Sequence, residues 1–282
     1  MTMNMPISEH GVEGTLGNLR NRIPGQAAMS ACLEIHRNDP ERSWLRRVFG
    51  ASPLSTEAWP WYQGALGEAR VGRLLQNIGP EWTVLHAVPV GSGDSDIDHV
   101  VIGPAGVLTL NTKHHAGQAI WIAGKAVLVS GKKQRYVHAA AHEATRAAKL
   151  LSAASGQDVQ VSGVLVFVGA KNLKVKDRFP AVAAVTDGQL LRHLKRLRPT
   201  LTPAQVAAVG AAAARPETWH KNPTPGDSPA AVSGNFAALQ WRVRGARRRR
   251  MAWAGVAFAG FLGAAASLPT ALPLLADMLA AR

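Results

Sequence analysis

The hydrophobic pattern predicts helices on both sides of a strand-rich middle region. Apolar residues recur three or four positions apart, as in helices, in the segments 27–49, 59–78, 138–155, 187–198 and 202–214. Short β-branched or alternating runs, bounded by turn residues, predict strands at 81–90, 98–102, 107–113, 119–122, 126–130, 159–168 and 181–186. Because helices and strands follow one another in mixed order, we predict the α/β class, with a mixed central sheet flanked by helices.

The last apolar segment predicts a C-terminal transmembrane helix. Residues 251–276 carry no charge, and a bilayer core needs about 20 apolar residues in helical form. Arg247–Arg250 precede this segment, and a basic flank stays on the cytoplasmic side of a membrane. Trp253 suits an interfacial anchor. We therefore predict membrane localisation through a single-pass C-terminal anchor, with the main domain cytoplasmic. The alternative is an Ala-rich helix buried in a soluble core.

Small residues recur along this segment. Gly255, Ala259 and Gly263 lie four residues apart, a spacing that lets two membrane helices approach closely. The spacing predicts a homodimer through this face, although segments rich in Ala and Gly also produce it by chance.

Composition and charge exclude several classes of protein. The chain has 282 residues, and its 47% hydrophobic content excludes wholesale disorder. A single cysteine, Cys32, excludes an intramolecular disulfide and a four-cysteine zinc site. The net charge is +14, of which residues 60–215 carry +9, and a separate cluster of arginines lies at 242–250. We interpret the arginine cluster as a topology signal for the apolar tail. Only the charge of the middle region therefore suggests a phosphate-handling domain.

These observations predict the organisation of the chain. The predicted regions are a disordered N-terminus at 1–25, a helical extension at 26–58, a main domain at 59–214, a Pro-rich and Arg-rich linker at 215–250 and the transmembrane helix at 251–276.

Three acidic residues of the main domain are candidates for chemistry. Glu68 shares the apolar face of its predicted helix, and a buried acid is costly unless a partner binds it. Asp96 and Asp98 point to the same side of a predicted strand, because side chains alternate along strands. Carboxylates at a strand end suit Mg²⁺, which prefers oxygen ligands. The plainer alternatives are a carboxyl satisfied by a neighbouring base and a solvated turn.

A lysine ends the next predicted strand. Asn111 and Lys113 point the same way on it. A lysine beside a metal ion can orient the attacking water or offset the charge of a phosphate. Taken alone, a lysine at a strand end is more often an exposed residue without a special role.

Two histidines on a predicted helix have the spacing of a zinc-binding pair. His138 and His142 lie one helical turn apart, but the segment HAAAH lacks the glutamate of the zinc-peptidase motif H-E-x-x-H. We therefore favour a pair that faces phosphate or solvent over a zinc site.

The order of these motifs resembles the nuclease-related domain (NERD) family. The resemblance spans about 64–198 and rests on Gly67-Glu68, Ile97-Asp98-His99, Gly103-Pro104-x-Gly106-Val107 and Thr112-Lys113-x-x-x-Gly117. It implies a restriction-endonuclease-like fold with a PD-(D/E)xK site. By motif, Glu68 matches the acid of the first helix, Asp98 the metal-binding aspartate and Lys113 the motif lysine.

One position departs from the family pattern. Asn111 stands where the motif has an acid, so a carbonyl oxygen replaces a carboxylate. The resemblance implies Mg²⁺ (or Mn²⁺) held by Glu68, Asp98 and Asn111, and we expect the missing charge to weaken that binding.

Three hypotheses follow from these residues. The first is a membrane-tethered, Mg-dependent nuclease (a phosphodiester hydrolase) that uses Glu68, Asp98, Asn111 and Lys113 on DNA. Its nucleic-acid contacts would be non-specific and would include Lys132, Lys133 and Arg135. The second is a catalytically impaired nucleic-acid-binding module, which the substitution at position 111 favours. The third is a membrane-associated scaffold.

Overall fold

The computed structural model describes residues 17–91, 95–220 and 227–280, and for residues 264 and 266–280 it describes the backbone alone. The chain divides into two compact units, one of residues 1–31 and 60–232, the other of residues 32–59 and 233–282. Of the N-terminus predicted as disordered, 1–25, residues 1–16 lie outside the described residues, as does Asp94.

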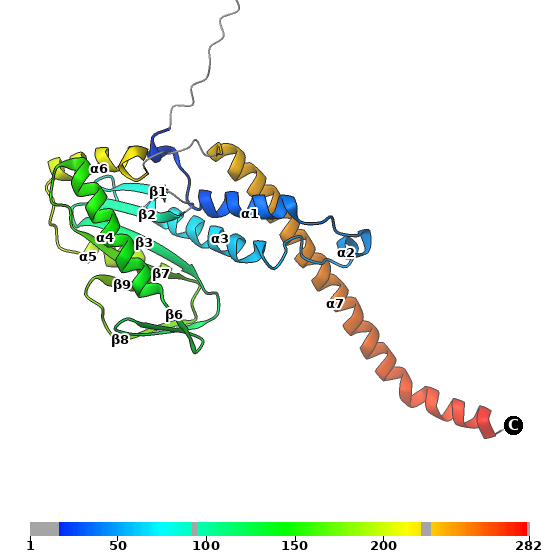
Figure 1. The fold of residues 1–282 in the computed structure, drawn as a ribbon. Helices are drawn as coiled ribbons and strands as arrows, with labels where there is room; N and C mark the ends of the chain where they lie inside the picture. The colour runs from blue at the N-terminus through cyan, green and yellow to red at the C-terminus, as the bar shows by residue number, and fades with distance from the viewer. Residues whose placement is uncertain (1–16, 92–94, 221–226, 281–282) are drawn as a thin grey trace, which may run out of the picture. The chain divides into compact units, whose positions relative to one another are not determined.

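A five-stranded mixed sheet forms the centre of the first unit (Figure 1). Its order is β1 (Thr83–Pro89), β2 (Asp96–Gly103), β3 (Gly106–His114), β7 (Val161–Val168) and β9 (Val182–Thr186). The first three strands are antiparallel, whereas β7 and β9 run parallel to β3. Gly106 closes the tight turn between β2 and β3 with a φ of 107°, a conformation that glycine adopts without strain.

A second sheet has the order β6 (Lys132–Gln134), β5 (Ala126–Val129), β4 (Ala119–Ala123) and β8 (Asn172–Asp177). The pattern of apolar residues predicted β4 and β5 but missed the two edge strands. The sequences of β6 and β8, KKQ and NLKVKD, carry little apolar alternation because most of their side chains are exposed.

Helices cover both faces of the central sheet. On one face, α4 (Tyr136–Ser155) packs through Ala147 and Leu151 against Val100 and Val107 of the sheet. On the other face lie α3 (Ala58–Leu75) and α5 (Leu190–Arg196), whose buried side chains cluster with β2, β3 and β7. A further helix, α6 (Pro203–Ala213), packs in the same apolar cluster as α4. The predicted mixed α/β architecture with flanking helices is therefore confirmed.

The segment predicted as one helix over 27–49 is divided. It forms α1 (Gln26–Asn38) and α2 (Trp44–Val48), separated by Pro40. A proline disfavours the helical conformation of the residue before it, so α1 ends ahead of it.

The C-terminal helix, α7 (Pro229–Ala280), begins within the residues predicted as a linker, with proline in its first turn. It carries the arginines of 242–250 and continues through the apolar tail. Gly255, Ala259 and Gly263 are exposed on it, and the homodimer stays a prediction.

The predicted transmembrane helix at 251–276 is corrected by the structure. Among the described residues, no helix is long and apolar enough to cross a membrane. Trp253, predicted as an interfacial anchor, instead donates its indole N–H to the Val48 carbonyl over 3.1 Å and packs on Phe49. The single-pass C-terminal anchor, and the localisation that rested on it, are therefore not supported.

Candidate active site

The candidate active site lies beside β2 and β3, and α3 brings the first acid to it. Gly67 allows this approach, because a Cβ at that position would lie 3.2 Å from the Cβ of His114 and 3.3 Å from the Cγ2 of Thr112. Glu68 follows directly in the helix and interacts electrostatically with Asp98 and with Lys113. The predicted first-helix acid is thus close to the predicted strand residues.

Asp98 is fixed by the backbone of the neighbouring strand. Its Oδ2 accepts a hydrogen bond from the Thr112 N–H over 2.6 Å. Strand alternation places Asp98 on the same side of β2 as Val100, which packs in the cluster that contains α4. Asp96 lies two residues earlier, where Arg22 forms an ion pair with it at 3.6 Å.

Asn111 has an acidic partner that the sequence motifs did not reveal. Its Nδ2 donates a hydrogen bond to Oε2 of Glu143, a residue of α4, over 3.1 Å. Two oxygens beside this bond, Oδ1 of Asn111 and Oε1 of Glu143, are buried without a hydrogen-bond partner among the described residues. A carboxylate therefore stands next to the position at which the motif acid is missing.

The approach of α4 depends on a glycine in the sheet. A Cβ at Gly163 of β7 would lie 3.1 Å from the carbonyl oxygen of Ala140 on α4. Because β7 is the neighbour of β3, this close packing holds α4, and with it Glu143, over the strand that carries Asn111.

Burial raises the pKa of all three acids. Burial, and then the neighbouring Asp98 and Asp96, raise the pKa of Glu68 well above 4.5. Burial also raises the pKa of Asp98, although Lys113 and the Thr112 hydrogen bonds oppose this. Burial and the charge of Asp98 raise the pKa of Glu143 to about 8. Such a group of desolvated acids favours either bound protons or a bound cation.

Lys113 lies between the acids and an aromatic cluster. Its Nζ is 5.2 Å from the centre of the Tyr136 ring, a cation–π distance. The Tyr136 hydroxyl is hydrogen-bonded to Nε2 of His115 over 3.1 Å, and the two rings are stacked. This cluster limits the freedom of the lysine, which also interacts electrostatically with Glu68, Asp98 and Glu143.

The chemistry of the donors suits a hard cation. The candidate ligands, Glu68, Asp98, Asn111 and Glu143, offer oxygen atoms, and two of those atoms are buried and unpaired. In the part of the chain that the structure describes, no three His, Cys, Asp or Glu side chains form a metal-binding group by themselves. An ion at this site would therefore depend on the amide oxygen of Asn111 as well.

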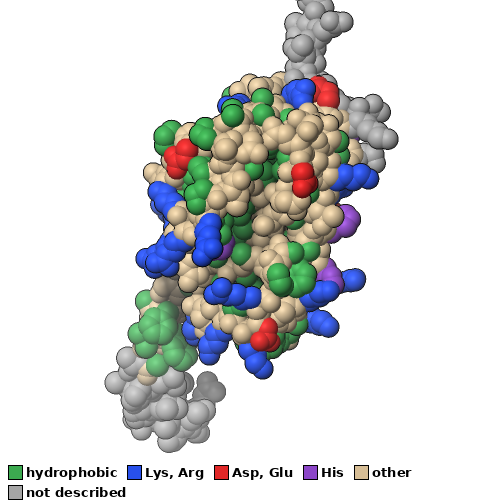
Figure 2. All heavy atoms as spheres, turned by 90° about the vertical axis from the view of Figure 1, so that its left-hand side faces the viewer, with side chains coloured by type: hydrophobic (Ala, Val, Ile, Leu, Met, Phe, Trp, Pro, Cys, Tyr) green, Lys and Arg blue, Asp and Glu red, His purple; other side chains and the backbone are tan. Residues whose placement is uncertain are grey.

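The remaining predicted residues are all exposed. Lys132 and Lys133 are exposed on β6, and Arg135 is exposed just before α4. His138 and His142 are exposed on α4. The face of the molecule in Figure 2 carries many Lys and Arg side chains and few carboxylates, as a surface that meets phosphates would.

Comparison with known proteins identifies the middle of the chain. Residues 63–168 match the model of the nuclease-related domain family, NERD, which confirms the resemblance seen in the motifs. The matched region contains Glu68, Asp98, Asn111, Lys113 and Glu143. The chain thus contains a nuclease-related domain. No curated protein matches it.

A solved structure is also similar over part of the chain. It is that of Pyrococcus furiosus SfsA in complex with Ca²⁺, with 17% identity over 52% of this chain and a TM-score of 0.20. The match covers 53% of that protein, so the chain spans about half of its length.

Proposed function

We propose that the nuclease-related domain is a metal-dependent nuclease that hydrolyses phosphodiester bonds in DNA. The observation that carries the proposal is the contact between Asn111 and Glu143. It supplies a carboxylate beside the one motif position that lacks its acid, and it does so from a separate helix.

The proposed ion is Mg²⁺ or Mn²⁺, held by oxygens of Asp98, Asn111 and Glu143, with Glu68 as the further acid. When bound, it would polarise the scissile phosphate and offset the charge that develops there. It would also replace the protons that the crowded carboxyls hold, because an adjacent cation favours their ionised form.

The residues of the chain have separate roles in the proposed hydrolysis. Asp98 is oriented by the Thr112 N–H and contributes a carboxylate to the proposed ligand set. Lys113 donates hydrogen bonds to the scissile phosphate or to the water that attacks it, and the Tyr136 ring restricts its position. Water attacks phosphorus, the bond to the leaving oxygen breaks, and that oxygen acquires a proton. The basic surface contacts the backbone of the nucleic acid without reading its sequence.

Cleavage of plasmid and linear DNA by the full chain, with and without Mg²⁺ or Mn²⁺, tests the proposal. We expect metal-dependent cleavage that is lost in Asp98→Ala and in Lys113→Ala. Lys149→Ala, which removes an exposed lysine of α4, is the matched control and should cleave like the wild type. Cleavage that persists unchanged in both site variants would rule out this active site.

Asn111 also favours a second candidate function, a nucleic-acid-binding module without catalysis. This module would bind DNA in a salt-sensitive manner without cutting it, because phosphate contacts release counterions. Absence of cleavage by the wild type and by Asn111→Asp, together with retained binding, would select it. Cleavage gained only in Asn111→Asp would instead indicate a catalytic frame that the amide disables.

A further inference from the structure

A second hollow lies at the far edge of the central sheet from β1. Its volume is about 570 Å³, within the range of small-molecule sites. It is lined by β9, by α5, by the end of β8 and by the segment 178–181 that joins the two strands. Glu68, Asp98, Asn111, Lys113 and Glu143 are all absent from its lining, so it is distinct from the candidate active site.

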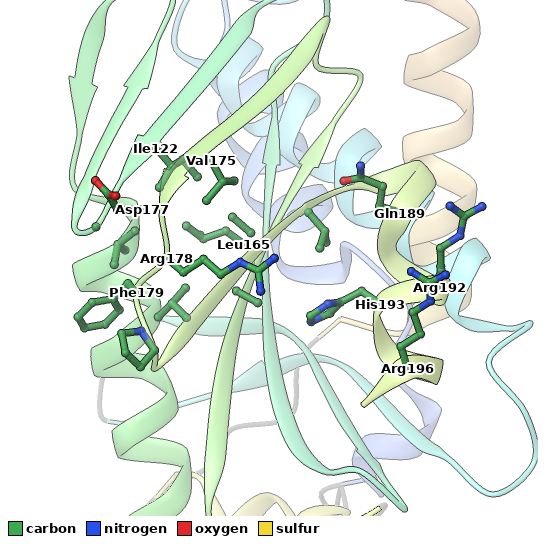
Figure 3. Close-up of a pocket in the computed structure, with 17 residues that line it drawn as sticks. Ile122, Leu165, Val175, Asp177, Arg178, Phe179, Gln189, Arg192, His193 and Arg196 are labelled. Carbon is green, nitrogen blue, oxygen red and sulfur yellow. The ribbon is translucent and has the colours of Figure 1, made fainter. Parts of the chain in front are cut away.

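The floor of this cavity is apolar. Ile122, Val137 and Leu165 form part of it, and these side chains are buried in one hydrophobic cluster. Phe179 adds an aromatic ring at the wall (Figure 3). Such a floor binds the flat or aliphatic part of a ligand by removing apolar surface from water.

The rim carries more positive than negative charge, because three arginines and one carboxylate line the cavity. Arg178 belongs to the segment between the strands, and Arg192 and Arg196 belong to α5, one helical turn apart (Figure 3). No ion pair among the described residues involves any of these three arginines. Like charges one turn apart repel each other, so an anion bound between them would relieve a cost that the free protein bears. Lys125, outside the lining of the cavity, packs on the lining residue Phe179, with its Nζ 5.4 Å from the centre of the ring.

Both hydrogen-bond donors and hydrogen-bond acceptors line the cavity together with the arginines. Oε1 of Gln189 accepts a hydrogen bond from the Thr186 N–H, which leaves its amide N–H groups for a ligand. Asp177 offers a carboxylate at the opposite wall (Figure 3). Burial lowers the pKa of the His193 ring, and the nearby charge of Arg178 lowers it further.

We propose that this cavity binds a nucleoside phosphate, with the phosphate on the arginines and the base on the apolar floor. Guanidinium groups bind phosphate oxygens with good geometry, and Asp177 and Gln189 provide the acceptor and donors that a base or sugar needs. A fatty carboxylate would use one arginine and leave these polar groups without a partner. The nucleotide is either free in solution or the phosphorylated end of a strand, since both present the same group. The proposal does not depend on the nuclease activity.

Calorimetric titration of the full chain with each of the four common nucleoside 5′-monophosphates tests the proposal. We expect at least one to bind about tenfold more tightly than inorganic phosphate, because the base adds apolar contact. Arg178→Glu and Arg192→Glu should each weaken nucleotide binding by about tenfold or more. Lys195→Glu, an equal charge change at an exposed position of α5 outside the cavity, should leave it unchanged.

Further variants distinguish binding of the base from binding of the phosphate, and this cavity from the candidate active site. Val175→Trp fills the cavity from a position that is already 40% exposed, and it should weaken nucleotide binding without reducing phosphate binding. Asp98→Asn should retain nucleotide binding, so the failure of the nuclease proposal would leave this one standing. A 5′-phosphorylated hexanucleotide that binds and is weakened by the same arginine variants identifies a strand end as the ligand. If only mononucleotides bind, the ligand is free nucleotide.

Several results would overturn the assignment. They are the absence of nucleotide binding, equal affinity for inorganic phosphate, binding that survives both arginine variants, and loss of binding in Asp98→Asn. Binding of decanoate in place of every nucleotide would equally contradict it. Circular dichroism of each variant shows whether it is folded, and the control variant on the same helix identifies any general effect of charge reversal.

Discussion

The side-chain amide of Asn111 on β3 donates a hydrogen bond to the carboxyl of Glu143 on α4, with 3.1 Å between Nδ2 and Oε2. The bond orients the amide so that its carbonyl oxygen is buried without a hydrogen-bond partner among the described residues, as is the second oxygen of Glu143. Two oxygen atoms from different elements are thereby left for a ligand. In the proposed active site, α4 supplies the acid that β3 lacks.

Glu143→Gln should weaken Mg²⁺ binding by at least about tenfold, because it removes a carboxylate from the proposed ligand set. Isothermal titration of the full chain with Mg²⁺ measures this change. Asp158→Asn, which neutralises an exposed acid just beyond α4, is the control and should bind like the wild type. Equal affinity in Glu143→Gln and the wild type would give Glu143 a purely structural role.

Asn111→Asp should make the protein depend on a divalent cation for part of its stability. The variant replaces the amide that donates to Glu143 by a second carboxyl. Two adjacent carboxyls disfavour each other's ionised form. Without metal we expect the free energy of unfolding to fall by about 1–3 kcal/mol, and with saturating Mg²⁺ we expect most of it to return. Urea unfolding under both conditions measures the difference. A loss of stability that Mg²⁺ does not restore would argue against an ion at this position.

The raised pKa of Glu143 gives stability a specific pH dependence in metal-free buffer. The group keeps its proton in the folded protein up to about pH 8, whereas the unfolded chain releases it near pH 4.5. Its contribution is therefore complete below pH 4.5 and is lost as the pH rises through about 8. Relative to Glu143→Gln, which does not titrate, the wild type should lose on the order of 5 kcal/mol between these limits. A constant difference in urea unfolding would show that Glu143 is ionised when folded.

Gly67→Ala and Gly64→Ala should have opposite effects although both lie on α3. Nothing lies within 4 Å of a Cβ at Gly64, so alanine there should stabilise the helix by about 0.5–1 kcal/mol. At Gly67 the new Cβ would meet His114 and Thr112 at 3.2 and 3.3 Å, which should push the helix and Glu68 away from β3. Thermal unfolding and the cleavage assay compare the two variants. Equal gains in stability with full activity would show that the close approach is not required.

The histidine pair on β1 and β2 predicts acid sensitivity. His86 and His99 share a hydrogen bond between their Nδ1 atoms over 2.8 Å, and the bond requires that one of these two nitrogens is unprotonated. Burial lowers the pKa of His86 to about 4 and that of His99 well below 6.5. Stability from these rings is therefore present above pH 6.5 and is lost as the pH falls toward 4.

Replacing one ring tests that pair. His86→Gln keeps a hydrogen-bonding side chain but does not titrate, so it should lose less stability than the wild type between about pH 7 and about pH 4.5. Urea unfolding at a series of pH values measures the two slopes. Identical slopes would show that other groups cause the acid sensitivity.

The short-range features of the fold were predictable from the sequence. The alternation in β2 and β3 and the turn at Gly103–Gly106 depend on neighbouring residues, and they placed Asp98 and Lys113 on adjacent strands. The family motifs predicted that Glu68 belongs to the same site. The exposed edge strands β6 and β8 were missed, because a strand without an apolar face leaves no periodic signal.

What the tertiary structure decided is which distant residues meet. Glu143 is 32 positions from Asn111, and its contact depends on the parallel pairing of β7 with β3 and on the close packing that Gly163 permits. No local pattern encodes that pairing, so the acid that compensates for Asn111 was invisible in the motif. The interpretation of the apolar tail was also wrong, because among the described residues no helix is long and apolar enough to cross a membrane. Composition gives the hydrophobicity of a segment, but only the folded chain shows that Trp253 is bound by Val48 and Phe49.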